Sequence, residues 1–197
     1  MTIPIPTLDR SLPLLRWDLA MYYAAARAGV FEGHRVELLD GNLFEIEMPE
    51  PIHEWLIEAL RAYLEEMLGD RAMVREAKPV TLSNNSEPIP DVTVVRKQGY
   101  RRRHPSPEDI SLVIEIANCN PNCDTKTKRP AYARGGILEY WVFDLVKQEL
   151  RVFRDIQGEG DAADYSTDLV WPIETIQMCA FPEVEFSATK LKQLAFD

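Results

Sequence analysis

The chain has 197 residues, of which 46% are hydrophobic and 27% are charged. This length and composition suit one globular domain with its own hydrophobic core, so neither disulfides nor a structural metal is needed for stability. The formal net charge of -10 argues against wholesale binding to a polyanion, and no apolar stretch approaches the ~18 residues of a transmembrane helix.

The cysteines indicate a reducing compartment. Cys119, Cys123 and Cys179 are odd in number and lack a paired CxxC framework, which predicts free thiols and excludes a tetrahedral zinc site. The first residues have neither a basic region nor the apolar run of a secretion signal. We therefore expect a cytoplasmic protein.

The first predicted elements are a helix and a hairpin. Residues 18–28 predict a short helix that ends at Gly29. In the following VELLDGNLFEIE the dipeptide Asp40-Gly41 predicts a tight turn, because these residues tolerate positive φ values. Glu37 is expected on the first strand of the hairpin.

The next element is a long amphipathic helix. Apolar residues recur at helical spacing over residues 52–68, and Gly69 supplies a stop. The stripe is wide enough to cover a sheet. His53 is expected in the first turn of this helix.

Strands and shorter helices fill the rest of the chain. Their order indicates an α/β sandwich with a mixed central β-sheet flanked by helices. Strands are predicted at 73–82, 91–96, 110–117, 139–145 and 149–154, a helix from Asp124 to Gly135, an acidic loop at 157–168, weaker strands at 169–171 and 183–186, and a terminal helix at 188–196.

A basic cluster lies in the loop before the strand at 110–117. Two interpretations stand: a solvated loop whose charge keeps it exposed, or a local arm that contacts phosphates on an otherwise acidic protein. The cluster consists of Arg96, Lys97, Arg101, Arg102, Arg103 and His104.

Two acidic residues suggest a metal site. Glu115 interrupts the apolar run SLVIEIA, where a carboxylate is costly unless it is paired, protonated or bound to a cation. Asp91 follows Pro90 at the start of the preceding strand. If the two strands pair as neighbours, the acids meet at one sheet edge and form a hard-oxygen site suited to Mg²⁺ or Mn²⁺.

A lysine completes this candidate site. Lys128 lies on the helix after the acidic strand and is predicted to reach back toward the carboxylates, where its ammonium would activate water or offset phosphate charge. Lys126 ranks second, since residues two apart do not share a helix face.

Five segments resemble the bacterial Uma-type endonuclease family of the PD-(D/E)XK restriction-endonuclease-like superfamily. They are FEGHRVELLDGNLFEI, PIHEW, EPIPDVTVV, LVIEIAN and DTKTKRPAYARGGILEYWVFDL, and the resemblance as a whole runs from about Trp17 to Arg154. The resemblance implies a restriction-endonuclease-like sandwich with an added N-terminal helix and β-hairpin. One domain is expected over 1–197, with the helix and hairpin at 17–47, the nuclease core at 52–154 and a C-terminal extension at 155–197.

The resemblance also implies an activity. It predicts a Mg²⁺-dependent or Mn²⁺-dependent endodeoxyribonuclease with Asp91 and Glu115 as metal ligands and Lys128 as the signature lysine. The departure is that Ala117 stands where the motif has lysine, so Lys128, four residues before Tyr132, takes that role. Glu37 and His53 match further family positions and are candidates for the active site.

The resemblance points to partners as well. DNA is the expected partner, with Arg101, Arg102 and Arg103 as candidate contacts, and members of the superfamily commonly form pairs, so we expect a homodimer.

Structural roles remain open for the same residues. Asp91 also suits a strand-entry turn, Glu115 a buried ion pair with Lys128 or an arginine, and His53 a packed residue at a helix start. Two other functions stay open. One is an inactive relative that binds nucleic acid or protein, and the other is a two-carboxylate glycosidase that works without metal.

Overall fold

The structure is a computed structural model that describes residues 14–46, 48–117, 123–170 and 175–196. Residues 1–13, Cys119 and the end of the weak strand predicted at 169–171 lie outside these ranges. The helices are α1 (Leu19–Arg27), α2 (Pro51–Leu68), α3 (Arg129–Arg134) and α4 (Ala188–Phe196). The strands are β1 (Val36–Leu39), β2 (Asn42–Glu45), β3 (Met73–Glu76), β4 (Val92–Val95), β5 (Ile110–Ala117), β6 (Glu139–Asp144), β7 (Glu149–Gln157), β8 (Asp164–Val170), β9 (Thr175–Met178) and β10 (Phe181–Ser187).

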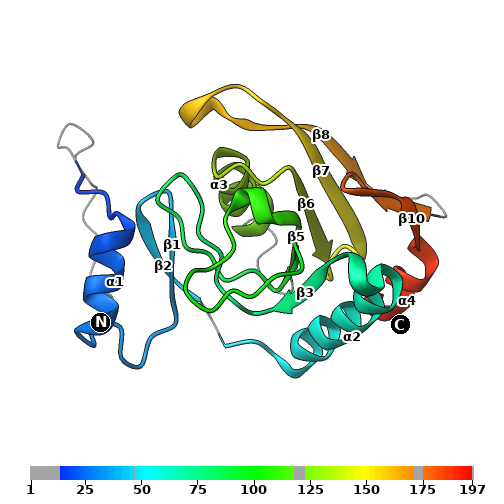
Figure 1. The fold of residues 1–197 in the computed structure, drawn as a ribbon, viewed down its shortest axis with the longest axis horizontal. Helices are drawn as coiled ribbons and strands as arrows, with labels where there is room; N and C mark the ends of the chain where they lie inside the picture. The colour runs from blue at the N-terminus through cyan, green and yellow to red at the C-terminus, as the bar shows by residue number, and fades with distance from the viewer. Residues whose placement is uncertain (1–13, 47, 118–122, 171–174, 197) are drawn as a thin grey trace.

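A six-stranded sheet organises the molecule, in the order β3-β4-β5-β6-β7-β8. Strands β5 and β6 pair in parallel, and the other neighbours in this sheet are antiparallel. The parallel pair requires a crossover, and α3 lies within it (Figure 1). The expected mixed α/β sandwich is confirmed.

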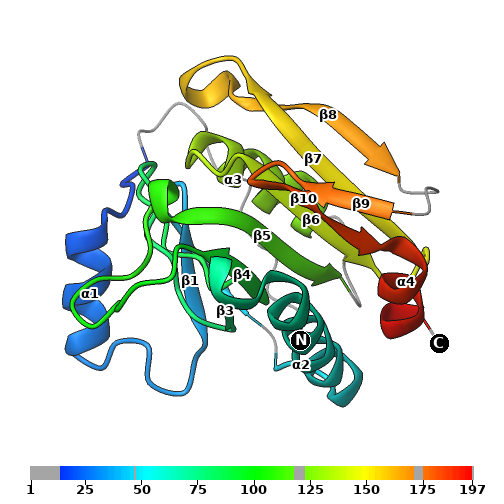
Figure 2. The same cartoon turned by 45° about the vertical axis from the view of Figure 1, so that its right-hand side comes forward.

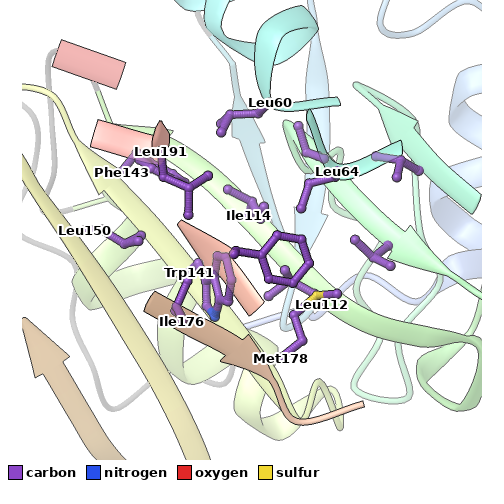
Figure 3. Close-up of a cluster of buried hydrophobic side chains, with 14 of the residues drawn as sticks. Leu60, Leu64, Leu112, Ile114, Trp141, Phe143, Leu150, Ile176, Met178 and Leu191 are labelled. Carbon is purple, nitrogen blue, oxygen red and sulfur yellow. The ribbon is translucent and has the colours of Figure 1, made fainter. Parts of the chain in front are cut away.

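One face of the sheet packs against α2 and the C-terminal elements. Figure 3 shows Leu60 and Leu64 of α2 over Ile114 and Trp141 of the sheet, with Leu191 of α4 beside them. Figure 2 shows α2 and α4 on the same side of the sheet, and the two helices are in contact. The segment from β9 to α4 therefore belongs to the main core.

The opposite face carries α3. Successive side chains of a strand point to opposite faces, so Val113 and Tyr140 face away from α2. They pack with Tyr132 of α3 and with Phe153 in a second buried cluster. Glu115 shares this face, because it lies two residues after Val113 on β5.

The N-terminal helix and hairpin form as predicted. The Asp18 carboxylate caps α1 by accepting a hydrogen bond from the Met21 amide at 2.7 Å. Asp40 and Gly41 have φ values of 48° and 71°, so the hairpin turn uses the left-handed conformation that this dipeptide tolerates. Glu37 lies on β1, as expected.

The strand predicted at 73–82 is shorter than expected. It ends at Glu76 because Ala77 has a φ of 45°, which turns the chain away from the sheet direction. The Ala77 amide then donates to the Asp91 carbonyl at 2.9 Å, and Pro79 follows. The apolar pattern beyond this turn belongs to a loop whose Val80 and Leu82 fill the core on the α3 face.

The acidic loop predicted at 157–168 is partly strand. β8 begins at Asp164 and pairs with β7 at the edge of the sheet. Its acids tolerate this position because they face arginines: Asp164 accepts from Arg129 at 2.9 Å, and Asp168 pairs with Arg151 at 2.5 Å. The prediction also missed β9, which pairs with β10 in a separate two-stranded sheet.

The remaining predictions hold with small changes. The helix expected from Asp124 begins as a π-helical segment, Cys123–Lys128, and continues as α3. The terminal helix is confirmed as α4, and the Ser187 hydroxyl caps it by accepting from the Lys190 amide at 3.1 Å. Within the described ranges, every helix is too short or too polar to cross a membrane.

Candidate active site

Strand register brings the two predicted acids together. Val92 of β4 pairs with Ile114 of β5 in antiparallel register, so the next position along places Asp91 opposite Glu115. Directly opposite residues project from the same face of a sheet. The Ile116 amide also donates to Asp91 Oδ2 at 2.7 Å, which fixes the Asp91 carboxylate against β5.

Glu115 is held by two donors from the crossover. The residue is 2% exposed. Its Oε1 accepts from Tyr132 Oη at 2.6 Å and from Lys128 Nζ at 3.0 Å. Lys128 and Tyr132 are four residues apart, and this spacing places both side chains on one helical face.

Lys128 lies among three carboxylates. Besides Glu115, its ammonium lies 3.4 Å from Glu37 Oε1 and 3.8 Å from Asp124 Oδ1. Glu37 comes from β1, where its other oxygen accepts from the Ile89 amide at 3.3 Å. The hairpin, β5 and the crossover therefore converge on one ammonium group.

The burial of this cluster shifts its proton affinities. Burial raises the pKa of Glu115 well above its ordinary value, Lys128 opposes this shift, and the neighbouring acids add to it. Burial likewise raises the pKa of Asp124 to about 6. For Lys128, burial lowers the pKa but the surrounding carboxylates outweigh it and raise the pKa well above its usual range, so Lys128 carries a charge.

His53 contacts the other side of Asp91. The first turn of α2 places His53 Nε2 3.1 Å from Asp91 Oδ2. Burial lowers the pKa of His53, but the hydrogen bond to Asp91 and the charge of Asp91 together outweigh burial and raise it. The other ring nitrogen, Nδ1, is buried and has no hydrogen-bond partner among the described residues.

A small pocket opens onto these groups. It has a volume of about 100 Å³, and its lining includes His53, Asp91 and Lys128 together with Arg35 and Ile89. A water molecule occupies roughly 30 Å³ of liquid, so the pocket has room for a few waters or one small anionic group.

The donor set fits a hard divalent cation. Donors from the described residues engage Asp91 Oδ2 and Glu115 Oε1 and leave the second oxygen of each carboxylate without such a donor. The described residues gather no group of three or more His, Cys, Asp or Glu side chains able to hold a metal. Mg²⁺ is commonly bound by one or two carboxylates with several waters retained, which matches two acids beside a pocket.

Sequence reasoning missed two members of this cluster as site residues. Asp124 precedes Lys128 by four positions and Tyr132 follows it by four, so helical spacing around the predicted lysine was the available signal. Lys126, ranked second, is exposed. This agrees with the expectation that it points elsewhere.

The basic loop is not part of the cluster. Arg103 donates to Asp109 at 2.5 Å, and Asp109 precedes β5 while Glu115 lies six residues along that strand. At about 3.3 Å per residue the two ends are roughly 20 Å apart. Arg101 and Arg102 are exposed, which agrees with both interpretations of the loop.

A larger depression lies elsewhere. It has a volume of about 700 Å³ and is lined by Asp40, Asn84 and Arg134, among others. Its central carboxylate is already engaged, because Arg134 and Asn84 both donate to Asp40. The smaller pocket beside Asp91 therefore remains the candidate for chemistry.

Comparisons with known proteins bear on the fold and on the family. A search of curated proteins found no match. Among solved structures, the chain is similar to one described as a "putative nuclease belonging to DUF820" from Anabaena variabilis ATCC 29413, with a TM-score of 0.64 and 14% identity over 83% of this chain and 93% of that one. At this identity the likeness shows the fold.

The profile of the Uma2 family, described as "Putative restriction endonuclease", matches residues 19–183. This match covers most of the chain and includes Glu37, His53, Asp91, Glu115 and Lys128. The chain therefore belongs to the Uma2 family.

Proposed function

We propose that this protein is a metal-dependent endonuclease that hydrolyses phosphodiester bonds of DNA. The observation that carries the proposal is that two acids and a lysine lie together beside a pocket. Asp91 lies opposite Glu115 on the neighbouring strand, and Lys128 contacts Glu115 at 3.0 Å. An acid pair with an adjacent ammonium suits the hydrolysis of a phosphate ester.

Each side chain has a specific role in this proposal. Asp91 and Glu115 would hold Mg²⁺ or Mn²⁺. The cation would act as a Lewis acid on the phosphoryl oxygen and lower the pKa of a bound water. Lys128 Nζ would offset negative charge that develops on the phosphate, and it keeps Glu115 Oε1 oriented together with Tyr132. His53 and the Ile116 amide hold Asp91 in one rotamer.

Plasmid cleavage tests the proposal directly. Purified protein with Mg²⁺ or Mn²⁺ should nick or linearise supercoiled plasmid, and Asp91→Asn should abolish cleavage. The matched control is Asp70→Asn, because Asp70 is a surface carboxylate whose side chain is 97% exposed. Equal cleavage by wild type and Asp91→Asn would overturn the assignment.

Metal binding separates the two alternative functions from the nuclease. A non-catalytic relative would bind Mn²⁺ by calorimetry, lose that binding in Asp91→Asn, and leave every nucleic acid intact. A glycosidase would keep its activity in EDTA, whereas the nuclease loses it. Two features favour the non-catalytic relative. They are the acidic net charge of -10 and the position of the lysine, which is residue 128 instead of two residues after Glu115.

The expected homodimer and the cytoplasmic location stay predictions. Light scattering coupled to size exclusion checks the first, and fractionation of the source cells checks the second.

A further inference from the structure

The candidate active site has an excess of negative charge. The site gathers four carboxylates, counted here as ionised, and one ammonium, with His53 at the edge. With a divalent cation in place, a formal surplus of one negative charge remains when His53 is neutral, and this surplus repels a phosphodiester. The carboxylates are Glu37, Asp91, Glu115 and Asp124, and the ammonium is that of Lys128.

Arg35 is the cation at the mouth of this site. It lines the same pocket as Asp91, His53 and Lys128. Its carbonyl accepts from the Ile46 amide at 2.7 Å, so the hairpin pairing continues through Arg35. Side chains two apart on an extended chain lie on the same side, which puts Arg35 on the side of Glu37, whose carboxylate contacts Lys128.

The guanidinium of Arg35 is available for a ligand. The residue is exposed, and its guanidinium has no hydrogen bond or ion pair with another residue in the described ranges. Several other arginines are engaged: Arg103 binds Asp109, Arg129 binds Asp164, and Arg134 binds Asp40.

The size of the pocket limits the ligand. At about 100 Å³, it is well below the roughly 300 Å³ at which pockets for drug-sized ligands begin. A phosphate group with one or two waters fits this volume. Arginine suits this ligand because its planar fork of donors matches phosphate oxygens.

We infer that Arg35 binds a backbone phosphate of the nucleic-acid substrate at the mouth of the pocket lined by Asp91, His53 and Lys128. The inference rests on the proposed nuclease function and adds the chemical group that Arg35 binds, which is a backbone phosphate. A phosphate contact carries no sequence information by itself, so this contact acts equally on DNA of any sequence.

Equilibrium binding tests the contact separately from cleavage. The probe is a fluorescein-labelled 20-base-pair duplex, followed by anisotropy with Ca²⁺ in place of Mg²⁺ or Mn²⁺, at several salt concentrations. Arg35→Ala should weaken binding about tenfold, the lower end for a hydrogen bond to a charged group, and should reduce the salt slope by about 1. The loss should be the same for duplexes of unrelated sequence.

Two further variants sharpen the result. Arg35→Lys keeps the positive charge but loses the planar, forked arrangement of donors. Compared with Arg35→Ala, it should therefore restore the salt slope of wild type but only part of its affinity. Arg27→Ala is the matched control: it removes an exposed arginine in the last turn of α1, and it should bind within twofold of wild type.

Each outcome decides a different point. If wild type cuts DNA and Arg35→Ala binds as well as wild type, the phosphate contact is refuted while the nuclease stands. If binding depends on Arg35 but no cleavage occurs with Mg²⁺ or Mn²⁺, the contact stands and the nuclease fails. If Arg27→Ala loses as much affinity as Arg35→Ala, or wild type binds no duplex, the contact is refuted.

Discussion

Replacing Lys128 with methionine removes the cation from the buried cluster while keeping a side chain of similar length. Lys128 is 7% exposed, and it contacts Glu115 at 3.0 Å, Glu37 at 3.4 Å and Asp124 at 3.8 Å. Removing one partner of a buried ion pair costs about 3–5 kcal/mol, because the remaining charge stays desolvated. We expect a loss of that size in the free energy of unfolding at pH 8.

The cost should shrink at lower pH. Without the ammonium, the acids around position 128 hold their protons more tightly in the folded than in the unfolded state. Such groups lower stability as pH rises. Burial already raises the pKa of Asp124 to about 6 and that of Glu115 well above its ordinary value. Below about pH 6 these acids take up protons, and the difference in stability from wild type narrows.

Urea unfolding followed by tryptophan fluorescence measures the loss in the free energy of unfolding and its dependence on pH. Lys126→Met is the matched control, because Lys126 is exposed on the same segment and surface substitutions usually change stability by less than about 0.5 kcal/mol. The double variant Lys128→Met with Glu115→Gln should recover at least about 1 kcal/mol. A loss below about 1 kcal/mol for Lys128→Met, or an equal loss at pH 5 and pH 8, would refute the reasoning.

Three further predictions concern the neighbours of the cluster. Tyr132→Phe removes the donor 2.6 Å from Glu115, and it should cost about 1.5–3 kcal/mol of stability in the same unfolding assay. His53→Gln disturbs the group that orients Asp91; calorimetry should show Mn²⁺ affinity falling about 10–100-fold, the usual loss when a partner of a metal ligand is changed. Arg102→Ala, in the basic loop, should leave the single-turnover cleavage rate unchanged, because the loop is anchored at the far end of β5.

Controls and contrary results differ for each variant. His34→Gln is the control for His53→Gln, because His34 pairs with Glu45 at the surface, with its side chain 58% exposed. Unchanged Mn²⁺ affinity in His53→Gln would argue against the orienting role. A stable Tyr132→Phe would show that water replaces the hydroxyl, and a slower single turnover in Arg102→Ala would bring the basic loop into the chemistry.

The parts of the fold that the sequence predicted are those with strong local signals. The long helix α2 follows from its apolar spacing and from Gly69, and the hairpin follows from Asp40-Gly41. The run around Glu115 predicted β5 with the bounds that the structure shows. The pairing of β4 with β5 required only that neighbouring strands pair, so Asp91 and Glu115 could be placed together before any coordinates.

The parts that the sequence did not predict depend on distant contacts. β8 was taken for a loop because its acids and nearby glycines resemble solvent-exposed chain, and only Arg129 and Arg151 on other elements make them acceptable in a strand. The end of β3 at Glu76 depends on the positive φ of Ala77, and an alanine in the sequence does not predict this conformation. No sequence pattern singled out Arg35 as a site residue, because its proposed role follows from the pocket that it lines.

The catalytic candidates are scattered over residues 37–128, on β1, α2, the entry to β4, β5 and the crossover. No short stretch of this polymer contains more than a fragment of the constellation. During biosynthesis, the ribosome must release the chain beyond Lys128 before the acids and the ammonium can meet. A nascent or proteolysed fragment that ends before Lys128 therefore lacks the ammonium of the cluster and cannot assemble the candidate site.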